Sequence, residues 1–574
     1  MTEKLQINTE RIDDIPVLMA QLDRMQGAAM LDDYCPTHGN WQGLSLGTVA
    51  AVWLTFILSE AKHRLSHVQP WAEARLKLLE GCLGQPVRAL DFADDRLAAI
   101  RDYLSRDQAW SAYERALNGR TLRVYELQPA RGRVDSTTAK GDGEVSAEGL
   151  VEFGHSKDKR PDLPQITINL SALDPLGLPL TTTVVAGQQA EDPLYVPEIK
   201  RVQQSLACPG VTYMGDSQMA ALQTRAYVVK SQDYYLCPLP AGQVSRQELG
   251  ELLGPVGSGQ QPLSAVYRDD EKIAQGYEYT VPLQEQVEGE PLEGTERRLA
   301  VRALHLAHAQ EQSVGARAGK ALAAVATRSE RAQGKRRFTA EADLQAAVEK
   351  IVTRYQVPGL LTLTYRSETT EWRVRAYATR PASTPVEQRV TVTASLNEVA
   401  LEEAKRSLGW RVYATNQRAE HLSLEQAVLA YRAEYLVEQA RGRLKGKALS
   451  LTPIYLETDQ RIIGLVRLLM SGLRMLTLLE FRARQQLPHE GGKLAGIYPG
   501  NPKRATERPT TEMMLRAFEG LTLTLMADAT GRRAQVTPLS AVQQRTLQLL
   551  GFSPDLYRRL SQHFSKPVLN LSEP

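Results

Sequence analysis

Three carboxylate side chains, far apart in the chain, have the residue types that phosphodiester chemistry needs. Asp135 ends the short run RGRVD, Asp216 ends VTYMGD, and Glu438 lies within YRAEYLVEQARGRLKGK. Oxygen-only ligands select hard cations, magnesium or manganese. Two such ions about 4 Å apart activate a water or a 3′-hydroxyl and stabilise the leaving oxygen of a phosphodiester. The trio therefore predicts a metal-dependent site, provided that separate elements hold the three side chains together.

The third carboxylate sits in a strongly charged segment, Tyr431–Lys447, which we interpret as one helix. Residues three, four and seven apart share a helix face, and here that face carries Tyr431, Glu434, Glu438, Arg441 and Lys445. The two glutamates are like charges four residues apart, which costs a few tenths of a kcal/mol unless a cation lies nearby. Positive charge at the end of the segment also suits the helix dipole. A solvated surface helix with ion pairs is the alternative interpretation.

Each carboxylate also has a simpler interpretation. Asp135 precedes Ser-Thr-Thr and could cap a turn. Asp216 could cap the helix expected to follow it. Glu438 could form one half of a surface ion pair with a neighbouring arginine. Glu434 competes with Glu438 as the third metal ligand.

The elements around the two aspartates alternate between strand and helix patterns. The order is three strands, helix, strand, helix, strand, which predicts a mixed α/β layer with acidic residues at the ends of the first and fourth strands. A hairpin is expected around Asp-Pro-Leu-Gly, and Ser217 is the expected N-cap of the second helix. The expected elements are Arg131–Ser136, Gln165–Leu173, Leu178–Ala186, Pro193–Leu206, Val211–Asp216, Ser217–Arg225 and Tyr227–Leu239.

Residues 1–120 show helical patterns that suit a small DNA-binding domain or any helical bundle equally. Their apolar run Leu44–Leu58 spans 15 residues, which is short of the roughly 20 needed to cross a bilayer, so a buried helix is expected. Leu456–Leu487 is predicted to be a long core helix, interrupted by arginines and therefore not a membrane span. The last 65 residues contain a strand pair followed by helices.

Residues 240–410 break the pattern and are predicted to be an insertion within the α/β domain. Arg298–Tyr355 is expected to be mostly helical, with a strongly basic middle at Arg328–Arg337. Leu360–Tyr377 is expected to form two strands around Ser367-Glu368. Trp410–Asn416 resumes strand character before the Tyr431 segment, which is the reason for treating the region as an insertion.

The composition is ordinary for a globular protein, with 43% hydrophobic and 24% charged residues. The net charge of +3 is too small to indicate a nucleic-acid partner, so any basic surface is local. Four widely spaced cysteines argue against a zinc site and fit a reducing cytosol. The charged N-terminus has no secretory signal, so a cytoplasmic protein without membrane contact is expected, and the family resemblance described below further implies association with the nucleoid.

As a set, these motifs resemble the DDE transposases of bacterial insertion sequences, in the branch of insertion sequence family four and its near relatives. That branch has a Tyr-x2-Arg-x3-Glu-x6-Lys motif, which this chain matches at Tyr431, Glu438 and Lys445 but not at Glu434. The contexts RVDSTT and GDS, the phrase GHSKDKRPDLPQI and the segment LKGKALSLTPIYL also look like the family. The resemblance covers roughly residues 125–490, and residues 1–120 look like the helical N-terminal region of these transposases.

The resemblance implies an α/β fold with a ribonuclease-H-like mixed-sheet core. It implies that Asp135, Asp216 and Glu438 are the catalytic residues and hold two Mg²⁺ ions, with Mn²⁺ able to substitute. The implied partner is double-stranded DNA, both transposon ends and target, bound by a homodimer in a paired-end complex. The basic and aromatic residues expected to contact this DNA are Tyr431, Arg432, Arg441, Arg443, Lys445, Lys447, His155, Lys157, Lys159 and Arg160.

The predicted organisation has five parts: 1–120, a helical N-terminal domain; 121–239 and 411–490, the two halves of the catalytic core; 240–410, the insertion; and 491–574, a small α+β C-terminal domain. The implied activity is binding of terminal inverted repeats, cleavage at transposon ends and joining of the 3′-OH to target DNA. Two alternatives stay open. One is a catalytically silent, transposase-derived DNA-binding regulator, and the other is a structure-specific nuclease without strand transfer.

Overall fold

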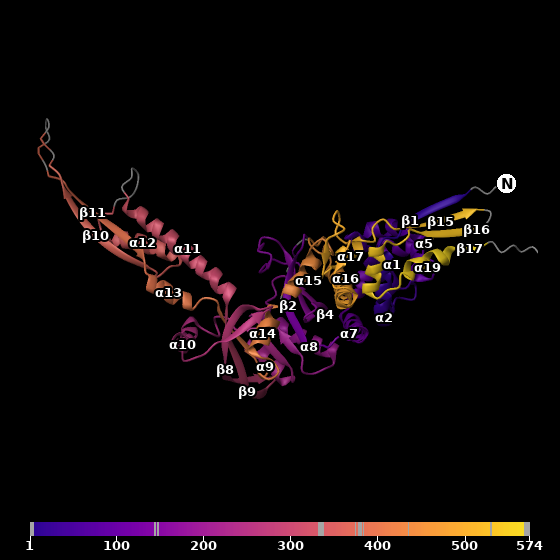
Figure 1. The fold of residues 1–574 in the computed structure, drawn as a ribbon, viewed down its shortest axis with the longest axis horizontal. Helices are drawn as coiled ribbons and strands as arrows, with labels where there is room; N and C mark the ends of the chain where they lie inside the picture. Colours follow the sequence, from indigo (N-terminus) through magenta and orange to yellow (C-terminus); the bar gives the residue numbers. More distant parts are fainter. Residues whose placement is uncertain are drawn as a thin grey trace, which may run out of the picture. The chain divides into compact units, whose positions relative to one another are not determined.

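The computed structural model describes residues 5–142, 145, 149–330, 338–373, 375–376, 381–382, 384–433, 435–528 and 531–567. It is a mixed α/β protein with many helices, and the chain divides into two compact units (Figure 1). The first unit comprises Met1–Leu236, Gln284–Leu292 and Ala430–Pro574. The second comprises Cys237–Leu283 and Glu293–Leu429.

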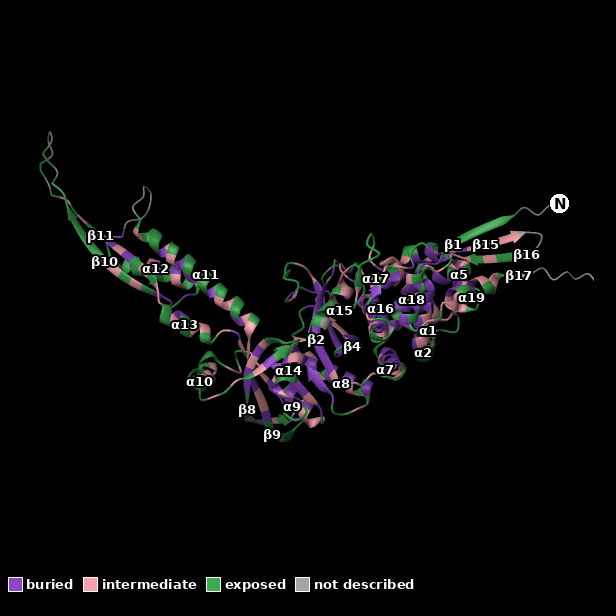
Figure 2. Ribbon diagram, viewed as in Figure 1, coloured by how far each residue is buried: buried purple, intermediate pink, exposed green. Residues whose placement is uncertain are grey.

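The sheet of the first unit has the strand order β4-β3-β2-β5-β6. β3 pairs antiparallel with both β2 and β4, whereas β5 pairs parallel with β2 and β6. The predicted alternation of strands and helices and the predicted hairpin are confirmed by the element order and by the antiparallel pairing of β3 with β4. Most residues of β2 and about half of those of β4 are buried (Figure 2). The elements are β2 (Arg131–Lys140), β3 (Gln165–Leu173), β4 (Leu178–Ala186), α8 (Tyr195–Leu206), β5 (Thr212–Met214), α9 (Leu222–Lys230) and β6 (Tyr234–Pro238).

Three boundaries in this region differ from the sequence prediction. β2 does not stop near Asp135 but runs on to Lys140. Ser217 is not an N-cap, because Asp216 first starts a turn in which its carboxylate accepts the backbone N–H of Gln218 at 2.9 Å, and α9 begins only at Leu222. The predicted strand from Tyr227 is helical at its start, because that stretch belongs to the end of α9.

A long buried helix, α16 (Asp459–Gln486), packs against the N-terminal helices, against β4 and against α18 in the C-terminal region. The N-terminal helices are α1 (Ile15–Met25), α2 (Gly27–Tyr34), α3 (Leu46–Glu60), α4 (Val68–Glu73), α5 (Leu76–Leu83), α6 (Asp94–Leu104) and α7 (Asp107–Val124). The expected core role of both apolar stretches is confirmed, since the side chains of α3 and α16 are mostly buried.

Within the described part of the chain, Asp459–His489 is long and apolar enough to cross a membrane by length and composition alone. However, 89% of its most apolar window is buried inside the protein. Arg467 and Arg474 lie within that buried stretch and donate to the Leu104 carbonyl at 2.8 Å and to Asn118 at 2.5 Å, respectively. α16 therefore has the surroundings of a core helix.

The C-terminal residues of the first unit form a second sheet, ordered β1-β15-β16-β17. The predicted strand pair is confirmed as β15 (Thr522–Asp528) and β16 (Gly531–Val536), but β1 (Gln6–Arg11) joins it at the edge. The first strand of the chain thus pairs with a segment more than five hundred residues away, which the predicted helical N-terminal region did not anticipate. The other elements here are β13 (Leu494–Ala495), β14 (Ala505–Thr506), α17 (Thr511–Arg516), α18 (Ala541–Leu550), α19 (Asp555–Phe564) and β17 (Lys566–Pro567).

The second unit contains four strands in the order β12-β9-β8-β7 and a separate hairpin, β10-β11. Its elements are β7 (Ser264–Arg268), β8 (Glu271–Val287), β9 (Glu290–Ala303), α10 (Arg246–Gly257), α11 (Leu304–Ser329), α12 (Glu341–Tyr355), β10 (Leu361–Glu371), β11 (Val386–Leu396), α13 (Glu398–Arg406) and β12 (Trp410–Thr415). The tip between β8 and β9, Gln284–Leu292, belongs to the first unit.

Two predictions for the second unit are corrected. The helical stretch expected from Arg298 begins only at Leu304, because the preceding residues complete β9 against β12. Leu360–Tyr377 does not fold into two strands, since β10 runs through the expected Ser367-Glu368 turn and pairs with β11. Most of the basic run Arg328–Arg337 lies outside the described residues.

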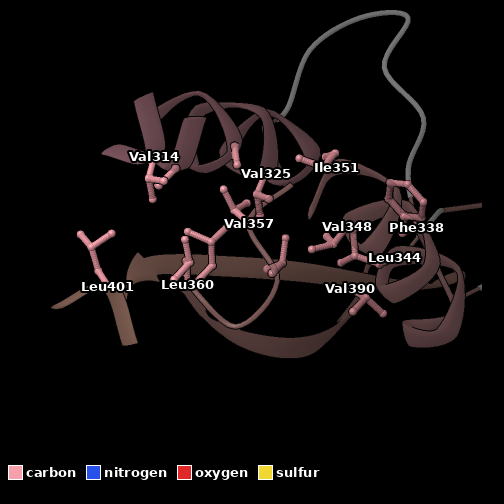
Figure 3. Packing of buried hydrophobic residues seen from close by; sticks show 14 residues of the cluster. Val314, Val325, Phe338, Leu344, Val348, Ile351, Val357, Leu360, Val390 and Leu401 are labelled. Carbon is pink, nitrogen blue, oxygen red and sulfur yellow. The ribbon is translucent and has the colours of Figure 1, made fainter. Parts of the chain in front are cut away.

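One face of the β10-β11 hairpin carries an apolar core of its own (Figure 3). Val314 and Val325 on α11, Val348 on α12 and Val390 on β11 meet there and are buried. α11 is exposed on its other side, as its alternating colours in Figure 2 show. This core is built entirely from residues between Val314 and Leu401.

Candidate active site

Asp135 lies within β2, and Asp216 lies two residues past the end of the parallel neighbour β5. The register pairs Arg133 on β2 with Met214 on β5, and each aspartate lies two residues further along its strand direction. Neighbouring strands are about 4.8 Å apart, so the register places the backbones of both aspartates near the end of β5. β2 continues beyond Asp135 to Lys140, whereas β5 ends at Met214, and the Asp135 side chain is buried.

Asp216 is held by the turn that follows β5 and by the first turn of α8. The Tyr195 hydroxyl donates to Asp216 Oδ1 at 2.8 Å, and that oxygen also accepts the Gln218 backbone N–H. The preceding residue is glycine for a steric reason. A Cβ at Gly215 would lie 2.9 Å from Met219 Cβ and 3.1 Å from the Tyr195 ring. Asp216 is half-buried, with its carboxylate fixed in place.

The segment Gly154–Ile166 lies against β2, and its Lys157 side chain contacts Asp135. Gly154 permits the close approach, since a Cβ there would lie 2.1 Å from the Gly187 carbonyl oxygen. The Lys157 backbone N–H donates to Thr138 Oγ1 at 3.2 Å, which pins the loop to the strand. Lys157 Nζ then lies 3.5 Å from Asp135 Oδ1, 2.9 Å from the Ser136 carbonyl oxygen and 3.1 Å from Glu191 Oε1.

The prediction of a single helix over Tyr431–Lys447 is wrong, because one helix ends at Arg432 and a second begins at Tyr435. α14 (Leu424–Arg432) ends there, Ala433 forms a turn, and α15 (Tyr435–Lys445) begins after Glu434, which lies outside the described residues. Tyr431 and Glu438 therefore do not share one continuous helix face. The buried Arg133 accompanies this break, donating to the carbonyl oxygens of Ala430 and Tyr431 at the end of α14.

α15 packs on β2 (Figure 1) and turns one face toward the aspartate strand. Arg441 contacts the Asp135 carboxylate through Oδ2, and Lys445 Nζ bonds both oxygens of Asp158 at 2.9 and 3.0 Å. Glu438 lies three and seven residues before these two cations, so it projects from the same helix face. Its side chain is exposed.

Arg441 is largely removed from water at this position. Burial lowers the pKa of its guanidinium to about 10, because the low-dielectric surroundings disfavour the charged form. The group still carries its proton at neutral pH. Asp135 therefore faces a full positive charge.

The segment after α15 returns to the same strand. The Ile454 backbone N–H donates to the Lys140 carbonyl at 2.9 Å, and Asp142 N–H donates to the Ile454 carbonyl at 2.8 Å. Three phrases on which the family resemblance rests, around Asp135, after Gly154 and after Leu444, thus meet along β2. Their sequence separation is about three hundred residues.

The remaining residues predicted to contact DNA have varied surroundings. Tyr431 is buried, Arg432 is half-buried and Lys447 is exposed. Arg443 lies on another face of α15 and bonds Glu512 at 2.8 Å and also Glu480. Burial opposes the charged form of Arg443, but these two carboxylates raise its pKa above the ordinary value.

In the loop after Gly154, His155 and Lys159 are exposed, and Lys159 has a positive φ of 58° at a tight turn. Arg160 pairs with Asp162 at 2.8 Å, and this hydrogen bond raises the pKa of the exposed guanidinium. DNA contact by the whole set stays a prediction.

The described residues contain no group of three or more His, Cys, Asp or Glu side chains gathered closely enough to hold a metal ion. The register of β2 and β5 aligns Asp135 with Asp216, and α15 packs on β2. Metal binding by the three carboxylates stays a prediction. In this structure Lys157 and Arg441 contact the Asp135 carboxylate, whereas Asp216 bonds Tyr195 and the Gln218 backbone N–H.

Sequence reasoning missed Glu191, Tyr195 and Arg133. Tyr195 is the first residue of α8 and bonds Asp216, and Glu191 lies four residues before it and pairs with Lys157. The sequence signal that could have identified them is an acidic and an aromatic residue close to the N-terminus of a helix that follows a strand. Arg133 is recognisable only as a cation within an otherwise buried strand, paired with Asp174 at 2.6 Å.

No protein-family model matches the chain, and no curated protein sequence matches it. Among solved structures, the chain is similar to a piggyBac transposase in a synaptic complex with hairpin DNA. The sequence identity is 7%, the TM-score is 0.35, and the match covers 99% of this chain and 90% of that one. A likeness at this TM-score carries no argument about the present chain.

Proposed function

We propose that this protein is a transposase that binds terminal inverted repeats, cleaves DNA at transposon ends and joins the 3′-OH ends to target DNA. The observation that supports the proposal is the register of β2 and β5, which aligns Asp135 with Asp216 just past the end of β5. The meeting of three separate family-like phrases along β2 supports it. The mixed sheet and its strand order are compatible with a ribonuclease-H-like core.

The proposed cofactor is Mg²⁺, replaceable by Mn²⁺, held as two ions by Asp135, Asp216 and Glu438. Carboxylate oxygens have the chemistry that these hard cations prefer, and α15 carries Glu438 on the face that meets β2. Bound ions of this kind activate a water or a 3′-hydroxyl for attack on a phosphodiester. The chain itself fixes the Asp216 carboxylate through Tyr195 and supplies cations around Asp135.

The proposed role of the surrounding cations is to hold the DNA backbone. Arg441 and Lys445 project from the α15 face beside Asp135, and Lys157 comes from the loop on β2. Phosphate contacts of this kind position the scissile bond without reading sequence. We further propose that two copies of the chain act together on paired ends.

The test is cleavage of a plasmid carrying the inverted repeats that flank the gene. Asp135→Asn and Asp216→Asn should each lower Mg²⁺-dependent cleavage by about 100-fold or more, whereas end binding in a gel-shift assay should persist. Undiminished cleavage by either variant removes that residue from the site.

The third ligand is tested by a matched pair of variants. Glu438→Gln should lose cleavage to the same extent as the aspartate variants, and Glu434→Gln should lose little. The reverse ranking would move the third ligand to Glu434.

One observation favours a second candidate, a catalytically silent DNA-binding regulator derived from a transposase. The Asp135 carboxylate is paired with Arg441 and Lys157, and the described residues hold no three-group metal cluster. A protein that shifts its own terminal repeats in a gel but never nicks them with Mg²⁺ or Mn²⁺ would be this regulator.

A further inference from the structure

The Asp135 carboxylate lies between two cations that come from different segments. Its Oδ1 accepts the Ser136 backbone N–H at 2.7 Å and lies 3.5 Å from Lys157 Nζ. Its Oδ2 contacts the Arg441 guanidinium. Both oxygens of a proposed metal ligand are therefore engaged with positive charge in the DNA-free protein.

Lys157 and Arg441 differ in the number of oxygen atoms that each contacts. Lys157 Nζ also bonds the Ser136 carbonyl and Glu191, so three oxygens hold the ammonium in place. Within the described part of the chain, the ion-pair partner of Arg441 is Asp135. Nearby cations on α15 have other anchors, since Lys445 bonds Asp158 and Arg443 bonds Glu480 and Glu512. Of Lys157, Arg441, Arg443 and Lys445, Arg441 is thus the cation whose release breaks the fewest ion pairs and hydrogen bonds among the described residues.

We propose that Arg441 is an exchangeable counter-ion that closes Asp135 to divalent cations until DNA phosphates draw the guanidinium away. This inference rests on the proposed function of the same site. A guanidinium and a metal ion compete for the same carboxylate oxygen, and phosphate oxygens suit the guanidinium fork as a bidentate alternative. Binding of DNA then raises metal affinity, and binding of metal raises DNA affinity by the same factor.

The test measures Mn²⁺ binding to the full-length protein by isothermal titration, without any cleavage readout. Arg441→Gln should bind Mn²⁺ about tenfold more tightly than the unmodified protein, because the competing charge is gone. Arg441→Lys keeps the charge and should stay close to the unmodified protein. Arg559→Gln is the matched control, since it removes an exposed positive charge on α19, remote in sequence from the site.

A second arm adds a DNA duplex of arbitrary sequence. The duplex should raise the Mn²⁺ affinity of the unmodified protein towards that of Arg441→Gln and should change the variant little. An equal effect of the duplex on both proteins would overturn the proposal. So would equal Mn²⁺ affinity of Arg441→Gln and the unmodified protein, or the same gain in Arg559→Gln.

Failure of this inference is distinguishable from failure of the proposed function. Asp135→Asn in the Arg441→Gln background should abolish the tight Mn²⁺ binding. If the double variant still binds tightly, the ion does not use Asp135, and both the exchange and the proposed metal site fail. If binding depends on Asp135 but not on Arg441, only the exchange fails.

Discussion

Glu114 on α7 is a buried carboxylate, whereas Asp216 is half-buried. Glu114 accepts the Trp110 indole N–H at 3.2 Å and pairs with Arg201 at 3.0 Å. Burial raises the pKa of Glu114 to about 7, with the neighbouring Glu198 acting in the same direction and Arg201 and Arg474 opposing it. The carboxyl therefore titrates near neutrality, whereas an ordinary glutamate is ionised there.

This pKa predicts a pH dependence of stability. The folded protein binds the Glu114 proton more tightly than the unfolded chain, whose glutamate titrates near 4.5. Stability from this group is therefore present at about pH 4.5 and is lost as the pH rises towards 7. In Glu114→Gln, the urea midpoint should fall less between about pH 5 and pH 8 than in the unmodified protein. An identical pH dependence in both proteins would show that Glu114 titrates normally.

At the scale of elements, α16 is the helix around which the first unit packs, and one glycine sets its crossing with α6. A Cβ at Gly464 would lie 2.1 Å from the Arg101 carbonyl oxygen and 2.7 Å from Arg101 Cα. The contact is with backbone, so the neighbouring helix would have to move. Helix propensity and packing therefore make opposite demands at this position.

Gly464→Ala should destabilise the protein despite the better helix propensity of alanine. The clash should cost about 1–3 kcal/mol, against a propensity gain of roughly 1 kcal/mol. Gly119→Ala on α7 is the matched control, because the nearest atom to its Cβ is a flexible arginine nitrogen at 3.9 Å. The free energy of unfolding of both variants, measured by chemical denaturation, tests this prediction. A stabilised Gly464→Ala would mean that α6 and α16 are not in close backbone contact.

At the scale of the whole molecule, the second unit contains a smaller module, residues 304–409, whose two ends lie next to each other. The Ala303 backbone N–H donates to the Gly409 carbonyl at 2.9 Å, and Gly409 N–H donates to Gln310 at 2.8 Å. The chain thus leaves β9 and rejoins β12 at one place. Between these points lies the apolar core of α11, α12, α13 and the β10-β11 hairpin (Figure 3).

We predict that a fragment of residues 304–409 folds alone, because the described residues of its core all lie within that range and its ends are adjacent. Circular dichroism should show a helical spectrum and a single cooperative thermal transition. A broad, non-cooperative melt would mean that the rest of the second unit is required for folding.

The sequence predicted local elements best where the hydrophobic period is clear. The strands of the Asp174-Pro175 hairpin and the helix α16 appear at the expected residues, since their apolar side chains alternate or repeat as their burial demands. The prediction failed where tertiary contacts override the local pattern. The helix break after Arg432, the late start of α9 and the extension of β2 to Lys140 are examples.

The amino-acid sequence by itself determined which residues could do chemistry, because carboxylate and cation types and their local contexts are written in it. Only the tertiary structure decided that the register of β2 and β5 aligns Asp135 with Asp216, that Lys157 and Arg441 both contact the Asp135 carboxylate, and that β1 pairs with β15. The physical reason is that register and long-range pairing depend on how many elements pack together at once. No single segment contains that information.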